Sequence, residues 1–374
     1  MENLTKILIP RQMFLLLVLS TGLLNHVILI PNLLKASGRD SWICVLIAYP
    51  IAIIFIWLLH YIIKHSSHGG FFPMIRYRFG RVVSYLFTAP IILFLITSTY
   101  ITVRDLVIWL SAYFLAETPV IVINLLIISA CYFITLSGIK YMAISSGFLL
   151  PLVVLLGIMI AVVNTSVKDP NLLFPVISDG YLPVVKGVMY VLAGLFEVYI
   201  VLLLQPFAQE PIKFKHLFIL LTFLTMLIFG PLTASIMEFG PIESKHFRYP
   251  AYEQWRILNI GEYISNLDFF ALYQWLSGGL IRISLFMFLL GVFFAKNKRE
   301  RLNIKLVTVL FLLLFSSLLI KVETYYFYKF IYLYFLPGIM MIFLSQTALA
   351  ALIVFVLKKR DEHNAKNNKM ESTT

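Results

Sequence analysis

The first candidate for chemistry is a carboxylate inside an apolar segment. Residues 183–207 are dominated by Val, Leu, Ile, Met and Tyr, and Glu197 stands among them, three residues after Gly194. An ionisable side chain at such a place is costly and by default marks a functional site. Facing an interrupted helix, Glu197 can receive a substrate amine or a coupling proton; facing its own helix, it can hold unwound backbone in shape. We predict a direct or indirect role in ligand binding.

Three further charges lie away from the ends of apolar segments. Arg282 requires a carboxylate or carbonyl partner, and Glu197 and Glu238 are the two candidate carboxylates. Arg104 and Asp105 are adjacent in sequence, so their side chains do not face one another on a helix. Two interpretations remain open for them: an interfacial pair with separate partners, or a gate.

Motifs of the common enzyme classes do not occur in the sequence. It has no phosphate-binding Gly-x-x-x-x-Gly-Lys-Ser/Thr loop, no His-Glu-x-x-His and no serine elbow. Cys44 and Cys131 lie in different apolar segments, without the spacing of a disulfide framework or a metal site. We therefore predict a protein that is not an enzyme, with no catalytic residues, no cofactor and no metal.

The composition indicates a membrane protein. Of 374 residues, 60% are hydrophobic and 13% are charged, and no stretch between apolar segments is long enough for a soluble domain. Most apolar segments have about the 20 residues that a bilayer-spanning helix needs. The sequence predicts an all-α polytopic protein with ten transmembrane helices, at residues 10–35, 41–63, 82–112, 119–138, 142–164, 183–207, 214–237, 268–294, 303–320 and 331–357.

The basic residues predict the orientation. With ten spans both termini lie on one side, and that side carries nineteen of the 30 Lys and Arg residues against nine on the other. The positive-inside bias therefore places both termini in the cytoplasm. It also accounts for the net charge of +12, which leaves no basic domain for nucleic acid. We predict one transmembrane domain over residues 1–357 and a disordered cytoplasmic tail over residues 358–374.

The first and sixth segments are interrupted at matching places. Each begins with a proline, contains a glycine about halfway (Gly22 and Gly194) and carries a second proline near its end (Pro31 and Pro206). Matched interruptions in two halves are the pattern of an inverted-repeat transporter with broken helices at the bilayer midplane. We predict a 5+5 inverted repeat, with its halves at about residues 10–165 and 183–357. Unwound backbone at such breaks exposes N–H groups to a carboxylate or another anion.

A family resemblance rests mainly on the loop after the seventh segment. Residues 238–250 read EFGPIESKHFRYP and are followed by AYEQWRILNIGEYISNLD. This stretch resembles the signature loop of the spore germination permeases, the B subunits of germinant receptors, which belong to the amino acid–polyamine–organocation superfamily. The resemblance implies a LeuT-type fold with helices one and six broken. It also implies a sensor of small nutrients, commonly amino acids, that acts in the spore inner membrane with an A subunit and a lipoprotein C subunit.

The resemblance also implies a ligand site at the two breaks. Carried over to this sequence, that site comprises Thr21, Gly22, Asn25, Ala193, Gly194, Phe196 and Glu197. Thr97 and Tyr100 of the third segment are expected to line the cavity that faces the breaks. Relatives that bind a carboxylate usually have a second glycine in the first segment, which this sequence lacks. We hypothesise that Asn25 and His26 instead donate side-chain hydrogen bonds to a polar nutrient without a carboxylate.

Two functions are compatible with this sequence. In the first, the protein is a receptor subunit, whose ligand-induced change is transmitted to partner subunits through the 238–268 loop and the cytoplasmic loops. Glu238, Gly240, Pro241 and Pro250 are its predicted partner or gating residues. In the second, it is a proton- or sodium-coupled carrier of amino acids or polyamines. The alternating aromatic and charged residues of the loop, suited to a cap or to docking a partner, favour the receptor.

Overall fold

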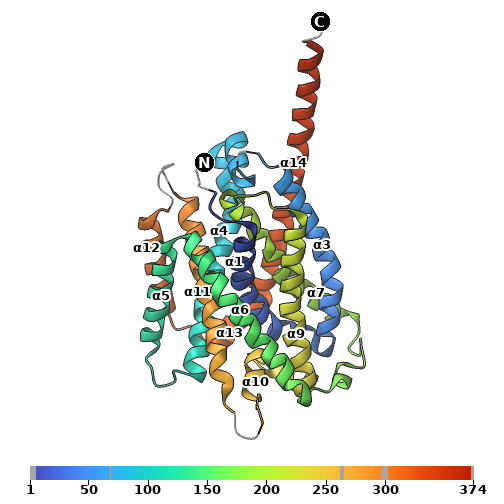
Figure 1. Ribbon diagram of the computed structural model, residues 1–374, viewed down its shortest axis with the longest axis vertical. Helices are drawn as coiled ribbons and strands as arrows, with labels where there is room; N and C mark the ends of the chain where they lie inside the picture. The colour runs from blue at the N-terminus through green and yellow to red at the C-terminus, as the bar shows by residue number, and fades with distance from the viewer. Residues whose placement is uncertain (1–5, 68, 262–264, 296–301, 372–374) are drawn as a thin grey trace.

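The computed structural model describes residues 6–67, 69–261, 265–295 and 302–371, and the regular elements in these ranges are helices joined by short loops (Figure 1). The one β-type contact in them is an isolated bridge between Leu8 and Ala208. Eight helical stretches of the described chain are long and apolar enough to cross a membrane. Helices suit this role because every backbone polar group inside them is satisfied internally. The prediction of an all-α polytopic membrane protein is confirmed.

The α-helices have the following bounds. In the first half they are α1 (Pro10–Leu23), α2 (Ile30–Ser37), α3 (Ser41–His65), α4 (Phe71–Tyr113), α5 (Val120–Ser137) and α6 (Ile139–Val163). In the second half they are α7 (Tyr181–Phe196), α8 (Val201–Leu204), α9 (Phe214–His246), α10 (Pro250–Arg256), α11 (Phe270–Phe293), α12 (Ile304–Leu318), α13 (Thr324–Phe330) and α14 (Leu336–Glu371). Short 3₁₀ and π turns join several of them.

All ten predicted apolar segments are helical. The count of eight is smaller because Pro10–His65 is one stretch of 56 residues that contains the first two segments, and because α12 has only 15 residues. The chain turns between these two segments at Gly38, whose φ of +52° lies in the region that glycine tolerates. Whether all ten helices cross the bilayer, and whether they form an inverted repeat, stay predictions.

The interruption of the first segment is a π-helix, η1 (Leu24–Leu29), between α1 and α2. Pro31 follows it after one residue, Ile30, and has no N–H to donate to the carbonyl of Val27. A widened turn ahead of a proline accommodates this loss of one hydrogen bond. A second π-helix, η8 (Ile331–Phe335), precedes Pro337 in the same way.

The interruption of the sixth segment is a tightened turn. After α7 the chain passes through the 3₁₀-helix η5 (Glu197–Ile200) into α8, and Phe196 and Val201 on either side keep right-handed helical angles. The sequence predicts unwound backbone at both interruptions, whereas the structure changes helix type at both and stays helical. Pairing within the helix satisfies the backbone more completely in an apolar environment than an unwound segment would.

The C-terminal residues also differ from their prediction. Residues 358–371 continue α14 as helix and extend beyond the bundle (Figure 1), whereas their polar composition predicts disorder. Extending an existing helix requires no new nucleus, which is the costly step of helix formation. The beginning of α1 and the end of α14 lie at the same end of the molecule (Figure 1). That this end of the molecule faces the cytoplasm stays a prediction.

We expect cysteine labelling to establish the orientation. Glu117 precedes α5 and Lys140 follows it, both are exposed, and the native cysteines Cys44 and Cys131 are buried. Glu117→Cys should react with a membrane-impermeant maleimide in intact cells, because the sequence places it outside. Lys140→Cys should react only after permeabilisation. The opposite pattern at the two positions would reverse the predicted topology.

Candidate functional site

The predicted carboxylate lies at the centre of the bundle. Glu197 is the first residue of η5, at the point where α7 tightens, and its side chain has no exposed surface. Its two oxygens face the guanidinium of Arg282 on α11. Nη1 of Arg282 donates to Oε1 of Glu197, and Nη2 donates to Oε2 over 3.1 Å. The sequence left Glu197 and Glu238 as candidate partners of Arg282, and the structure pairs it with Glu197 in a two-pronged ion pair.

All five N–H donors of Arg282 have acceptors. Besides the carboxylate, Nη1 donates to the backbone carbonyl of Ser20 over 3.0 Å, and Nη2 donates to Oγ of Ser98 over 2.6 Å. Nε donates to Oγ1 of Thr102 over 3.3 Å. The guanidinium also stands over the ring of Phe286, at 4.5 Å from its centroid. One buried cation therefore links α1, α4, η5 and α11, and its donors are fully used.

A second group of predicted residues lies where η1 meets α7. A Cβ atom added to Gly194 would collide with Oδ1 of Asn25, so only glycine permits this approach. Asn25 is fully buried, and neither its amide oxygen nor its amide nitrogen has a hydrogen-bond partner among the described residues. Thr21, one turn earlier, lies beside the carboxylate of Glu197 without the geometry of a hydrogen bond. Thr21 and Asn25 thus form a polar stripe opposite Gly194 and Glu197.

The remaining predicted ligand residues are divided between this centre and other places. Ala193 is buried in α7, and the ring of Phe196 stacks on Phe55 of α3 at 4.0 Å. Gly22 instead faces α9, where Leu227 lies 3.0 Å from the position of its absent Cβ. His26 also points to α9, with Nδ1 at 3.4 Å from the carbonyl of Leu227.

The structure places different residues of α4 at the centre from those the sequence selected. Thr97 is half-buried and makes no side-chain hydrogen bond with another described residue, and the hydroxyl of Tyr100 accepts one from Arg104 over 3.1 Å. Their neighbours Ser98 and Thr102 contact Arg282. These two hydroxyls stand four residues apart on one helix face, and this spacing is a signal that the sequence contains.

A second ion pair lies toward the predicted outer end of α4. Oδ1 of Asp105 accepts from Arg248 over 2.5 Å, from the Tyr249 hydroxyl over 3.3 Å and from the Tyr328 hydroxyl over 3.2 Å. Burial opposes the charge of Arg248, but Asp105 and the two tyrosines outweigh this and raise the pKa of the guanidinium. Burial, with Asp105, raises the pKa of the Tyr249 hydroxyl well above its usual value. This cluster joins α4 and α13 to the segment between α9 and α10.

Arg104 has partners of its own. It donates to the backbone carbonyls of Ile320 and Val322, over 3.4 and 2.7 Å. Of the two interpretations of Arg104 and Asp105, the structure matches the pair with separate partners.

The four predicted gating residues belong to a segment folded onto the bundle. The chain reverses at Gly240, with φ +78°, so that the Ser244 hydroxyl donates to the carbonyl of Ser235 over 2.7 Å. Pro241 follows the reversal, and Pro250 opens α10 and is buried. Glu238 lies 3.7 Å from Nζ of Lys168, which ties the end of α9 to the chain after α6.

The aromatic residues of this segment are mostly engaged within the chain. Tyr252 packs against Trp109 and Tyr113 of α4, with ring centroids 5.6 and 4.5 Å apart, and Tyr249 packs against Trp275 of α11 at 5.3 Å. The segment thus covers the end of α4 and the beginning of α11.

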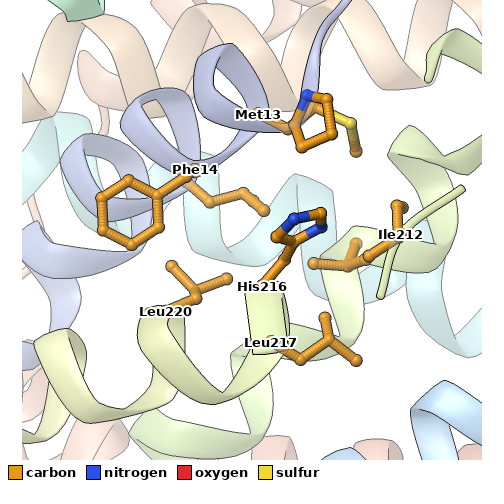
Figure 2. Close-up of a pocket in the computed structure, with 9 residues that line it drawn as sticks. Met13, Phe14, Ile212, His216, Leu217 and Leu220 are labelled. Carbon is orange, nitrogen blue, oxygen red and sulfur yellow. The ribbon is translucent and has the colours of Figure 1, made fainter. Parts of the chain in front are cut away.

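A small cavity of about 20 Å³ lies outside this centre, between α1 and α9 (Figure 2). Met13 and Phe14 of α1 line one side, and His216, Leu217 and Leu220 of α9 line the other. The cavity is apolar except for the imidazole, so it does not extend the polar stripe of Thr21 and Asn25. Within the described residues, no three His, Cys, Asp or Glu side chains are grouped so as to hold a metal ion.

The central ion pair predicts that substitutions of Glu197 and Arg282 have strongly non-additive effects on stability. Glu197→Gln or Arg282→Met leaves a buried charge unpaired, so each should cost roughly 3–5 kcal/mol of stability. The double variant should be more stable than the sum of the two losses predicts, because it removes both charges. Thermal unfolding of the purified protein measures this. Arg78→Gln, which breaks an exposed pair with Asp361, is the control and should cost about 0–1 kcal/mol. Additive losses from Glu197→Gln and Arg282→Met would contradict a direct interaction.

Comparison with known proteins places this architecture in a family. The model of a family described as spore germination protein matches residues 8–326. Spore germination protein XB of Bacillus anthracis is 36% identical over 326 residues, which cover 87% of this chain and 91% of that protein. Spore germination protein KB of Bacillus subtilis is 23% identical over 285 residues, covering 74% of this chain and 75% of that protein. The resemblance recognised in the 238–268 loop is confirmed, and the chain belongs to the spore germination protein family, the spore permeases.

Proposed function

We propose that this chain is the B subunit of a spore germinant receptor, which binds a small nutrient between α1 and α7 and triggers germination with partner subunits. Membership of the family and the germination names of its relatives support the process. The amide of Asn25, buried opposite Gly194 without a hydrogen-bond partner in the described part of the chain, carries the proposal for the ligand site. A buried polar group without a hydrogen bond costs about 1–3 kcal/mol, which a bound ligand can recover.

The charges of the centre favour a particular mode of recognition. Arg282 neutralises Glu197 and has no donor left for a ligand carboxylate, so binding an extra charge there would require the ion pair to open. Asn25 and Thr21 offer neutral donors and acceptors at the same interface. A small polar nutrient, an amino acid among them, would engage these side chains first. The role of Glu197 is then to hold α7, η5 and α11 in register around the site.

Two helices connect this centre to the outer cluster. On α4, Asp105 follows Ser98 by seven residues, about 10 Å along a helix. On α11, Trp275 precedes Arg282 by the same seven residues and contacts Tyr249. A ligand that shifts α1 against α7 would therefore act on the 247–256 segment through rigid helices. Bistable packing of such elements is the usual means of transmitting a change between sites.

The partners we propose are the A and C subunits of the receptor, in the spore inner membrane, with both termini of this chain in the cytoplasm. The 238–268 loop retains some free surface for them, because Ile242 beside the Gly240 reversal is 76% exposed. This exposed isoleucine is compatible with contact to a partner or to lipid.

A proton- or sodium-coupled carrier of amino acids or polyamines is the second candidate. The irregular turns η1 and η5 favour it, because π and 3₁₀ turns inside helices often mark functional hinges. Uptake of a labelled nutrient into vesicles that contain the purified protein would support the carrier. The receptor subunit predicts binding of the nutrient without its accumulation.

Germination of spores tests the receptor function. Spores that lack the gene should lose the response to one class among amino acids, nucleosides, sugars and salts, measured as release of dipicolinate, and the wild-type gene should restore it. Unchanged germination on every nutrient, in spores without other germinant receptors that could compensate, would overturn the proposal.

Asn25→Ala tests the ligand site within the same assay. We expect the half-maximal nutrient concentration to rise by roughly tenfold, because one or two ligand hydrogen bonds are lost. Asn124→Ala is the matched control, since Asn124 of α5 is also buried and its amide oxygen also lacks a partner. A normal response of Asn25→Ala at normal protein abundance would exclude this asparagine from the site.

A further inference from the structure

A cavity at the first bend of α4 is lined by two arginines. Gly80, with φ +82°, divides α4 into residues 71–79 and 81–113, and Arg76 and Arg81 on either side of it face the same space. The enclosed part of that space is about 20 Å³, as in the cavity between α1 and α9, and it is open to one side. The other side chains that line it are Phe72, Ser84, Tyr85, Thr88 and Phe293.

The positive charge of this cavity is not compensated within the described chain. Neither Arg76 nor Arg81 forms an ion pair with another described residue, and no Asp or Glu lines the cavity. The neighbouring Arg78 is different, because it pairs with Asp361 of α14 over 2.8 Å. Two guanidinium groups with a nearby serine hydroxyl form a site for a phosphate, whose oxygens suit planar paired donors.

The surface next to the cavity is apolar, so a ligand that also covers it needs an apolar part. The cavity-lining residues of α4 recur at the spacing of one helix face; they are Arg81, Ser84, Tyr85 and Thr88. The adjacent face of α4 is apolar and exposed. Its side chains Val82, Leu86 and Leu93 are 73%, 71% and 61% exposed. A ligand that satisfies both faces has a phosphate and an acyl chain on the same molecule.

The position fits a membrane interface. This part of α4 lies at the end of the bundle where α1 begins (Figure 1). The sequence assigns this end to the cytoplasmic side, where basic residues collect. Anionic headgroups of that leaflet attract such residues.

We propose that Arg76 and Arg81 bind the phosphate of an anionic phospholipid of the cytoplasmic leaflet, with its acyl chain along Val82, Leu86 and Leu93. This site lies apart from the proposed nutrient site and does not depend on it. The lipid fixes the bend at Gly80 against the end of α11, where Phe293 forms the opposite wall.

Native mass spectrometry of the detergent-solubilised full-length protein tests this site. The protein is titrated with phosphatidylglycerol, phosphatidylcholine or sodium phosphate. The wild type should prefer phosphatidylglycerol, and Arg76→Gln with Arg81→Gln should weaken its binding by roughly 25-fold, about fivefold for each charge. Arg78→Gln removes the same charge outside the cavity and should bind as the wild type does.

Each other result has a definite meaning. Equal binding of phosphatidylglycerol by the double variant and the wild type would overturn the site, as would an equal loss in Arg78→Gln. Binding of free phosphate as tight as that of the lipid would show an anion site without a lipid role and would also overturn the proposal. If the double variant does not fold, Arg81→Gln alone should still lose about fivefold, whereas Arg81→Lys, which keeps the charge but not the paired donors, should lose less than Arg81→Gln.

Discussion

The structure depends on the burial of one guanidinium group. A charged arginine inside an apolar bundle is tolerated only when a counter-charge and hydrogen-bond acceptors surround it. Glu197 of η5 supplies the charge, Ser20 of α1 supplies a backbone carbonyl, and Ser98 and Thr102 of α4 supply two hydroxyls. The helices that carry these groups must therefore keep one relative arrangement while the pair is intact. A buried network of this kind fixes a conformation more than it adds stability.

The helix irregularities follow from the same requirement. A regular helix presents its side chains at a fixed period, and the 3₁₀ turn that begins at Glu197 changes that period where the carboxylate must reach α11. The π turn ahead of Pro31 does the same for Asn25, which lies against the backbone of Gly194. Proline, glycine and the changed turns thus replace the fully unwound breaks expected from sequence. The backbone stays paired, and only the directions of the side chains change.

The sequence predicted those properties that depend on local composition. Length and hydrophobicity located the apolar helices, and the isolated charge identified Glu197. The choice between Glu197 and Glu238 as the partner of Arg282 depends on how distant helices pack, which hydropathy does not contain. Thr97 and Tyr100 were selected in place of Ser98 and Thr102 because the rotation of α4 about its axis is set by that packing. The resemblance of the 238–268 loop found the family, whereas the return of this segment onto Trp109 and Trp275 required the structure.

The two ion pairs stabilise different parts of the molecule. One lies at the centre of the bundle, and the other lies toward the end of α4. Arg282 joins the helices that flank the proposed nutrient site, and Asp105 joins the outer segment to α4 and α13. Because α4 carries acceptors for both arginines, a rotation of this helix that weakens one pair changes the geometry of the other. A carrier cycle that opened either pair would leave buried charges unpaired, at a high free-energy cost. A sensor needs only one conformational change that alters the two ion pairs. The network around Arg282, in which every guanidinium donor is used, favours such a single change.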